Sequence, residues 1–455
     1  MTDTPKDSFE LPLRGAANRR NVAAWLTLGL ISLAAAGVFS LLLVLARTPI
    51  IQGLIPLLDF FHIALVVHVT LSVLIWLLAM SAATWSLNTS DDKPIWDRLS
   101  FFLAALGTAT IIVCPFVGAG NPLMNNYVPI LQHPLFFAGL VLFIAGIVSH
   151  LVRSLVSRPR LGHNLSATFA LQAGITLSTL ITGLAITAVF ISWLGLPSEM
   201  DGRVYFEFLF WGGGHIVQFS YTLLMLIAWI VLAVASGCRF ELTPRLVLVF
   251  SIFLALPLIT VPFLYFAHDV TAVGHRLAFT ELMKYGGLSC LPLGLAVTAS
   301  LWRAEKPQGE ALYLRAALLS SLGLFAVGGI LGFMIAGLDI VIPAHYHGAT
   351  VGVTIAFMGL TYYLLPRLGF GDLPERMATW QPILYGGGQL MHIIGLAWSG
   401  GYGVQRKAAG AAQGLEGLGQ TAGMGLMGLG GLISVVGGLL FLIVAYQSMS
   451  RRQTQ

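Results

Sequence analysis

The stretch PAHYHGATVGVTIAFMGLTYYL, residues 343–364, decides the fold of this chain, because it places His345 and His347 near the start of a long apolar helix. Ionisable side chains inside a membrane span are costly and are functional by default. Residues two apart in an α-helix point roughly 200° apart, so the two imidazoles leave opposite sides of the helix. One metal ion cannot easily bind both rings of a straight helix, whereas two flat cofactors, one on each side of the helix, can each bind one ring.

The composition around this stretch is that of a membrane protein. Of the 455 residues, 57% are hydrophobic and 9% are charged, whereas a soluble domain has about 25% charged residues. Long apolar runs predict an all-α, polytopic fold of twelve transmembrane helices, centred near residues 34, 74, 110, 144, 180, 220, 257, 289, 324, 353, 390 and 436. We expect a membrane domain over residues 22–448, between short cytoplasmic tails at 1–21 and 449–455.

The net charge of +5 is a signal of topology and gives no hint of nucleic acid. If both termini are cytoplasmic, 18 of the 24 Lys and Arg residues lie inside, as the positive-inside rule expects. The six on the outer side are Arg47, Arg203, Arg276, Lys284, Arg406 and Lys407. The chain is therefore expected to lie among the lipids of a prokaryotic plasma membrane. The three scattered cysteines form no C-x-x-C pair, which argues against a zinc site or covalently attached haem.

Five histidines from four predicted helices share one depth in this topology. They lie in the outer third of the bilayer and are His68, His215, His268, His345 and His347. A shared depth is what a common layer of cofactors needs. By contrast, His150 and His163 are expected to flank a cytoplasmic loop, and His392 to be a packing or hydrogen-bonding residue in mid-span.

These motifs make the chain similar to the catalytic subunit of the haem-copper oxidase superfamily, which includes oxygen reductases and nitric oxide reductases. The stretch GLDIVIPAHYHGATVG (337–352) resembles the H-x-H pattern of the tenth span of that family, and VVHVTLSVLIWLL (66–78) resembles its second span. The resemblance implies that His345 ligates a high-spin haem. It also implies that His68 and His347 ligate a low-spin haem, and both haems are expected to be b-type.

The resemblance further implies a non-haem metal, to which FWGGGHIVQF (210–219) offers His215. The seventh span of the family normally ends in two adjacent histidines that bind copper, but FAHDVTAVGH (266–275) has His268 followed by Asp269. A carboxylate is a hard oxygen ligand, so this set suits iron better than copper. We expect non-haem iron, with copper as the alternative.

Two further positions complete the expected site. His275 is a rival ligand to Asp269, because it lies seven residues after His268 and so on nearly the same helical face. In the family, a charged segment between the last two spans meets the haem propionates, and here it offers Arg406 and Lys407.

The resemblance also bears on the gas that is reduced. Oxygen reductases of this family use a tyrosine cross-linked to a metal-ligating histidine. One position where it can stand holds Phe219 here, and the other stretch holds Leu258, Pro262 and other apolar residues. Reduction of nitric oxide to nitrous oxide needs no such tyrosine. We therefore expect a respiratory enzyme that reduces nitric oxide, with reduction of O₂ to water as the alternative.

The remaining expectations concern protons, electrons and other classes of function. No Asp or Glu lies in the predicted cytoplasmic half of a span, so proton uptake is expected from the outer side, with Glu207 or Glu281 as the acid. Electrons are expected from a donor subunit, a cytochrome c or a quinol. A proton-coupled transporter and a gas-sensing haem protein are the more distant alternatives.

Overall fold

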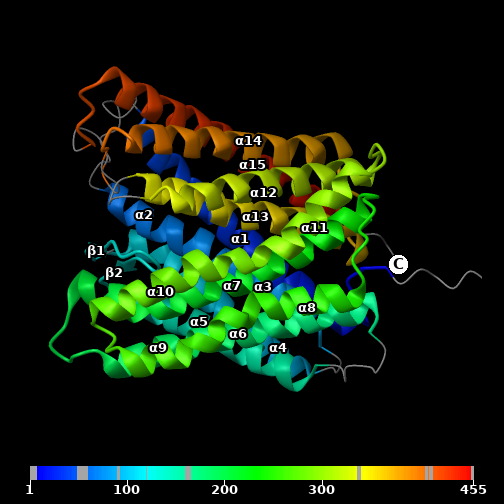
Figure 1. Ribbon diagram of the computed structural model, residues 1–455, viewed down its shortest axis with the longest axis horizontal. Coiled ribbons are helices and arrows are strands. Elements are labelled where there is room, and N and C mark those ends of the chain that lie inside the picture. The colour runs from blue at the N-terminus through cyan, green and yellow to red at the C-terminus, as the bar shows by residue number, and fades with distance from the viewer. Residues whose placement is uncertain are drawn as a thin grey trace, which may run out of the picture.

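The chain folds into a bundle of long helices that run along one common direction (Figure 1). The computed structural model describes residues 8–48, 60–89, 93–118, 120–158, 165–335, 340–404, 408 and 413–451. Arg406, Lys407, His163 and Asp339 lie outside the described residues.

The first half of the bundle consists of the following elements: α1 (Ala16–Arg47), α2 (Phe61–Val69), η3 (Thr70–Ile75), α3 (Trp76–Ser86), α4 (Pro94–Val113), η4 (Cys114–Phe116), β1 (Pro122–Leu123), β2 (Ile130–Leu131), α5 (Pro134–Val156), α6 (Ala167–Gly195) and α7 (Gly202–Ala235). The second half consists of α8 (Pro244–Ala255), η5 (Leu256–Thr260), α9 (Val261–Ala267), α10 (Val273–Gly286), η6 (Gly287–Cys290), α11 (Leu291–Trp302), α12 (Glu310–Phe333), α13 (Val341–Arg367), α14 (Glu375–Gly400) and α15 (Leu418–Ser450). The two short strands pair antiparallel.

Among the residues that the structure describes, eleven helical segments are long and apolar enough to cross a membrane. Three of them contain a break in α-helical geometry, so that α2, η3 and α3 form one span, as do α8 to α9 and α10 to α11. Helix α14 is a further helix of 26 residues, which polar side chains such as Gln381 and His392 make less apolar. The prediction of an all-α polytopic fold is confirmed. Helix α14 is the one predicted span that is not among the segments apolar enough to be recognised by composition.

The breaks have local causes. Pro257 lies in η5 and Pro292 follows η6, and proline favours such irregular turns because it removes a hydrogen-bond donor from the helix. The break in the second span is a π-helix that begins two residues after His68. There the hydroxyl of Ser32 on α1 donates to the carbonyl oxygen of Leu71, 2.7 Å away. Such π-helical turns occur frequently at functional sites.

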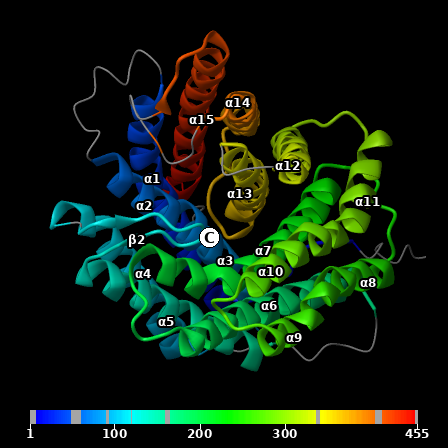
Figure 2. The same ribbon diagram turned by 60° about the vertical axis from the view of Figure 1, so that its left-hand side comes forward.

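Three spans form the interior of the bundle. The most apolar part of α7 is 89% buried, that of α13 is 83% buried and that of the α2–α3 span is 61% buried, whereas the other spans reach 50% at most. Figure 2 shows α3, α7 and α13 surrounded by the other helices. These three spans carry the histidines His68, His215, His345 and His347. The interior of the bundle is therefore built from the helices with the predicted ligands.

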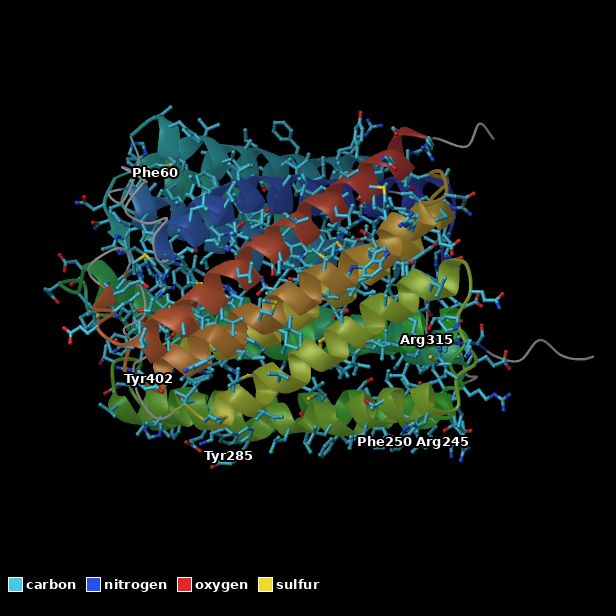
Figure 3. All side chains as sticks on the ribbon, turned by 90° about the horizontal axis from the view of Figure 1, so that it is seen from above. Phe60, Arg245, Phe250, Tyr285, Arg315 and Tyr402 are labelled. Atoms are coloured by element: carbon cyan, nitrogen blue, oxygen red, sulfur yellow. The ribbon has the colours of Figure 1, made fainter. Side chains whose placement is uncertain are left out.

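The two ends of the bundle differ in character. Figure 3 shows Phe60 and Tyr402 at one end, and Arg245 and Arg315 at the other. The strands β1 and β2 lie at the same end as the start of α2 (Figure 1), so we call it the hairpin end. The opposite end, marked by Arg245 and Arg315, is the arginine end.

Helices α14 and α15 pack through glycine. A Cβ atom on Gly395 would lie 2.5 Å from the carbonyl oxygen of Gly423, and one on Gly430 would lie 2.5 Å from that of Gly388. Small residues of this kind let the backbones of membrane helices approach closely.

We predict that Gly430→Ala destabilises the protein, because the added methyl group meets the backbone of α14. Overpacking of this kind costs about 1–3 kcal/mol. The control is Gly425→Ala on the same helix, where nothing lies within 4 Å of the new Cβ. Thermal unfolding in detergent should show a lower Tm for Gly430→Ala only, and equal Tm values for the two variants would contradict the close packing.

Candidate functional site

The two histidines of α13 contact different neighbouring helices. Nδ1 of His345 lies 2.8 Å from the carbonyl oxygen of Gly328 on α12. The ring of His347 lies against that of His392 on α14, with centroids 5.0 Å apart. The two imidazoles therefore leave α13 in different directions, as their spacing predicts.

Glycines make the room that His345 needs beside α12. A Cβ on Gly332 would lie 2.7 Å from Nδ1 of His345, and one on Gly348 would lie 2.9 Å from the backbone nitrogen of Gly328. Any larger residue would push α13 away from α12. The backbones thus pack closely enough for His345 to reach a carbonyl oxygen of α12.

His68 and His347 belong to one group of side chains. His68 on α2 lies close enough to His347 to interact with it electrostatically. His392 and Arg47 are equally near, and the side-chain amide of Gln389 is within hydrogen-bonding reach of His347. Imidazoles from α2 and α13 therefore face a common region near the hairpin end. Two imidazoles in one region could together hold a metal-containing cofactor.

Arg47, at the end of α1, adds a cation to this group. Its Nε and Nη2 atoms are buried and have no hydrogen-bond partner among the residues that the structure describes. Buried N–H donors without an acceptor are costly, so these two atoms favour a nearby anion. Beside two imidazoles, the carboxylates at the edge of a haem fit that need.

Four histidines of the described site share one hydrogen-bond pattern. In each, Nδ1 faces a backbone carbonyl oxygen: His68 and Ala36 at 3.0 Å, His215 and Trp211 at 2.7 Å, His345 and Gly328 at 2.8 Å, and His392 and Met427 at 3.0 Å. A carbonyl oxygen only accepts, so Nδ1 carries the proton and Nε2 keeps its lone pair. Histidines that ligate a metal typically donate their other N–H in this way.

His150 follows a different pattern. The expectation that it flanks a loop is wrong, because it is fully buried within α5. Its Nε2, and not its Nδ1, contacts the carbonyl oxygen of Ala82, 3.0 Å away. Arg153, one turn further along α5, forms a buried ion pair with Asp97, with 3.2 Å between Nε and Oδ1. This polar cluster stabilises the helix ends and lies apart from the site histidines.

His215 lies on α7 directly after three glycines, and each glycine accommodates a different neighbour. A Cβ on Gly212 would overlap the hydroxyl of Tyr265, one on Gly213 would overlap Val189, and one on Gly214 would overlap the ring of Tyr127. The sequence GGGH therefore lets other parts of the chain close around α7 immediately before the histidine.

His275 and Asp269 are placed very differently. His275 on α10 is completely buried, and neither ring nitrogen has a hydrogen-bond partner within the described part of the chain. It lies near enough to His215 and His268 for electrostatic interaction. Asp269, in the turn after α9, is exposed. The ring of His268 packs over Gly274, where a Cβ would lie 2.8 Å from Nδ1.

These side chains surround a region without converging on a point. Within the described part of the chain, no three His, Cys, Asp or Glu side chains are arranged to hold a metal ion. The expected set of His215, His268 and Asp269 is thus not brought together as it stands.

Tyr127 is a site residue that the sequence did not reveal. It belongs to the connection between α4 and α5, and its hydroxyl oxygen lies 2.8 Å from Nδ1 of His215. Burial raises the pKa of the Tyr127 phenol, so it stays protonated at physiological pH. Tyr127 lies 88 residues before His215, and no local pattern connects the two. For Arg47 the sequence likewise indicates only a charge on the outer side, because its burial depends on tertiary packing.

The two candidate acids differ in their surroundings. Glu207, two turns before His215 on α7, is partly buried and accepts hydrogen bonds from the backbone and side-chain amides of Asn126. Glu281 on α10 is exposed. Only Glu207 is thus connected to the surroundings of His215.

Comparisons with known proteins agree with this geometry. A family model described as cytochrome c and quinol oxidase polypeptide I matches residues 20–440. An uncharacterized protein of Rickettsia prowazekii is 30% identical, over 94% of this chain and 95% of its own length. An uncharacterized protein of Aquifex aeolicus is 31% identical, over 76% of this chain and 85% of its own length.

The fold is similar to that of a solved haem-copper terminal oxidase dimer. The TM-score is 0.74 at 15% sequence identity, over 97% of this chain and 86% of that chain. At this level of identity, the likeness concerns the fold alone.

Proposed function

This chain belongs to the cytochrome c and quinol oxidase polypeptide I family of haem-copper oxidases, and on that premise we propose that it reduces nitric oxide to nitrous oxide. Membership makes it a membrane-bound terminal oxidoreductase, which implies haem and a binuclear metal centre and removes the transporter from consideration. The choice of gas and of metal is the proposal developed below.

The main support for nitric oxide as the substrate is the residue four positions after His215. Phe219 is 2% exposed and packs near Gly286, where it can supply neither an electron nor a proton. The other position that can hold the tyrosine of the family is Leu258, which is buried and apolar as well. Reduction of two nitric oxide molecules needs only two electrons and two protons, which suits a site without that tyrosine.

Oxygen reduction is the second candidate, and one contact favours it. The hydroxyl of Tyr127 lies 2.8 Å from Nδ1 of His215, so a phenol does neighbour a candidate metal ligand. This phenol comes from a loop and not from the positions at which the family places its tyrosine.

We assign the haem ligands as their positions in the family motifs indicate. His68 and His347 would hold the low-spin haem, and His345 the high-spin haem. The protonated Nδ1 atoms of His68 and His345 support this assignment, since each leaves Nε2 free. Haem iron with two imidazoles only passes electrons, whereas iron with one keeps a position open for a gas.

For the non-haem metal we propose His215, His268 and His275 as the ligands. Three imidazoles suit iron and copper alike, so iron is proposed here because of the proposed reduction of nitric oxide and not because of the ligand set. The burial of His275 and its two unpartnered nitrogens support it as the third ligand over Asp269. Copper is the alternative metal, and Asp269 the alternative ligand.

We propose that the hairpin end faces outward from a prokaryotic plasma membrane and that both termini are cytoplasmic. Arg245 and Arg315 at the opposite end agree with the positive-inside rule (Figure 3). Glu207 then lies toward the outer side and is the better placed of the two acids for proton uptake. The electron donor is a cytochrome c, a quinol or a partner subunit.

The purified protein should convert nitric oxide to nitrous oxide under anaerobic conditions with a chemical reductant, and should contain non-haem iron. The control is His215→Ala, which should lose turnover and keep the low-spin haem spectrum. A protein that only senses gas would show no turnover in the wild type either. Copper in place of iron, together with rapid O₂ consumption, would contradict the proposal.

The third ligand is tested by two substitutions. His275→Ala should lower the affinity for the non-haem metal by at least about tenfold, because even loss of an outer partner costs that much. Asp269→Ala should leave metal content unchanged. Elemental analysis of both variants distinguishes the two ligands. Loss of metal in Asp269→Ala with normal metal content in His275→Ala would assign the third ligand to the carboxylate.

Arg47→Gln should lower the midpoint potential of the low-spin haem, because removing a nearby cation disfavours the reduced, more negative state. A unit charge about 8 Å away at an effective dielectric constant of about 20 contributes roughly 2 kcal/mol, on the order of 80 mV for one electron. The exposed Arg203 provides the control, as Arg203→Gln. A potential that is the same in both variants would show that Arg47 does not meet the haem.

A further inference from the structure

His347 has different polar neighbours from the other two proposed haem ligands. Nδ1 of His68 and Nδ1 of His345 each face a backbone carbonyl oxygen, 3.0 and 2.8 Å away. Among the described residues, the group within hydrogen-bonding reach of His347 is the side-chain amide of Gln389 on α14. The imidazole of His347 therefore meets a side chain where the other two rings meet a helix backbone.

Gln389 has an open acceptor beside this ring. Its side-chain oxygen Oε1 is buried and has no hydrogen-bond partner among the residues that the structure describes. A buried acceptor without a donor is costly. A neutral imidazole that binds iron through one nitrogen carries its proton on the other, and this N–H needs an acceptor. The open oxygen of Gln389 and the N–H of His347 thus complement each other.

The same side of α14 also packs against the ring. His392 lies three residues after Gln389 and so on the same side of the helix. Its ring lies against that of His347, with centroids 5.0 Å apart and 52° between the planes. Nδ1 of His392 donates to the carbonyl oxygen of Met427 on α15, 3.0 Å away, which fixes the orientation of this ring. One side of α14 thus offers His347 a packed neighbour and an open acceptor.

Glycine packing fixes the position of this side of α14. A Cβ on Gly388, the residue before Gln389, would lie 2.7 Å from the carbonyl oxygen of Gly430 on α15. A Cβ on Gly431 would lie 3.3 Å from Nδ1 of His392. Close contacts of this kind hold the two helices in one register. The backbone that carries Gln389 is therefore held in place against α15.

We propose that Gln389 is a positioning residue for the low-spin haem. Its Oε1 accepts the hydrogen bond from Nδ1 of His347, so that Nε2 of this ring is left for the iron. Partners of this kind fix the ring and the tautomer of a ligating histidine and raise its basicity. A more basic ligand favours the oxidised iron, so Gln389 lowers the midpoint potential of this haem. The inference rests on the proposed role of His347 as a haem ligand.

The test is a redox titration of the purified, haem-loaded protein. Gln389→Leu removes the acceptor and should raise the midpoint potential of the low-spin haem by about 59 mV or more, a tenfold change in a one-electron equilibrium. Gln389→Glu keeps an acceptor and makes it stronger, so it should lower the potential. A low-spin absorption spectrum like that of the wild type reports correct folding of each variant.

Two further variants separate this role from general effects on α14. The matched control is Gln381→Leu, which removes a buried glutamine of the same helix that accepts from the hydroxyl of Tyr362, 3.1 Å away. Its low-spin potential should equal that of the wild type. His392→Phe keeps a ring against His347, so it should also leave the potential unchanged.

Three outcomes would overturn the positioning role. They are a wild-type potential in Gln389→Leu, equal shifts in Gln389→Leu and Gln381→Leu, and a shift in His392→Phe without one in Gln389→Leu. The last would make His392 the acceptor. A wild-type protein without a low-spin haem would instead refute the proposed function, so the two failures are distinguishable.

Discussion

The arrangement of the interior histidines depends on hydrogen bonds between imidazole Nδ1 atoms and backbone carbonyl oxygens. Inside a bilayer a charged imidazolium is costly, and a neutral ring still has one N–H that needs an acceptor. His68, His215 and His345 each find that acceptor on a helix backbone. Each therefore keeps Nε2 unprotonated and available. Without these hydrogen bonds, burial of the histidines would leave an unsatisfied N–H, and Nε2 would not be kept unprotonated for binding a metal.

Close helix packing makes these hydrogen bonds possible. Gly328, Gly332 and Gly348 bring α12 to within reach of His345, and Gly214 brings Tyr127 onto α7. The π-helical turn after His68 adjusts the second span at the corresponding point. Glycine and irregular turns are thus concentrated where ligands must be placed, while the outer spans are ordinary apolar helices.

The sequence predicted the features that depend on residues close together in the chain. The apolar runs predicted the spans, and the spacing of His345 and His347 predicted that they face different neighbours. The features that it missed depend on tertiary contacts. Tyr127 meets His215 only because a loop folds back over α7, and Arg47 and His150 are buried by helices distant in sequence.

The third ligand position also depends on tertiary packing. Sequence spacing placed Asp269 and His275 as competitors after His268, and only packing distinguishes them. One side chain is exposed and the other lies in the core with two unpartnered nitrogens. Depth estimated from span boundaries could not resolve this difference, because Asp269 lies in the connection between α9 and α10, whereas His275 lies inside α10.

We propose that helix α13 separates two haems, one held by His345 and the other by His347. The haem content and absorption spectrum of the purified protein, beside those of His345→Ala and His347→Ala, test this arrangement. We expect two haems in the wild type, loss of the high-spin signal in the first variant and loss of the low-spin signal in the second. A wild type with a single haem, or two variants that lose the same signal, would contradict it.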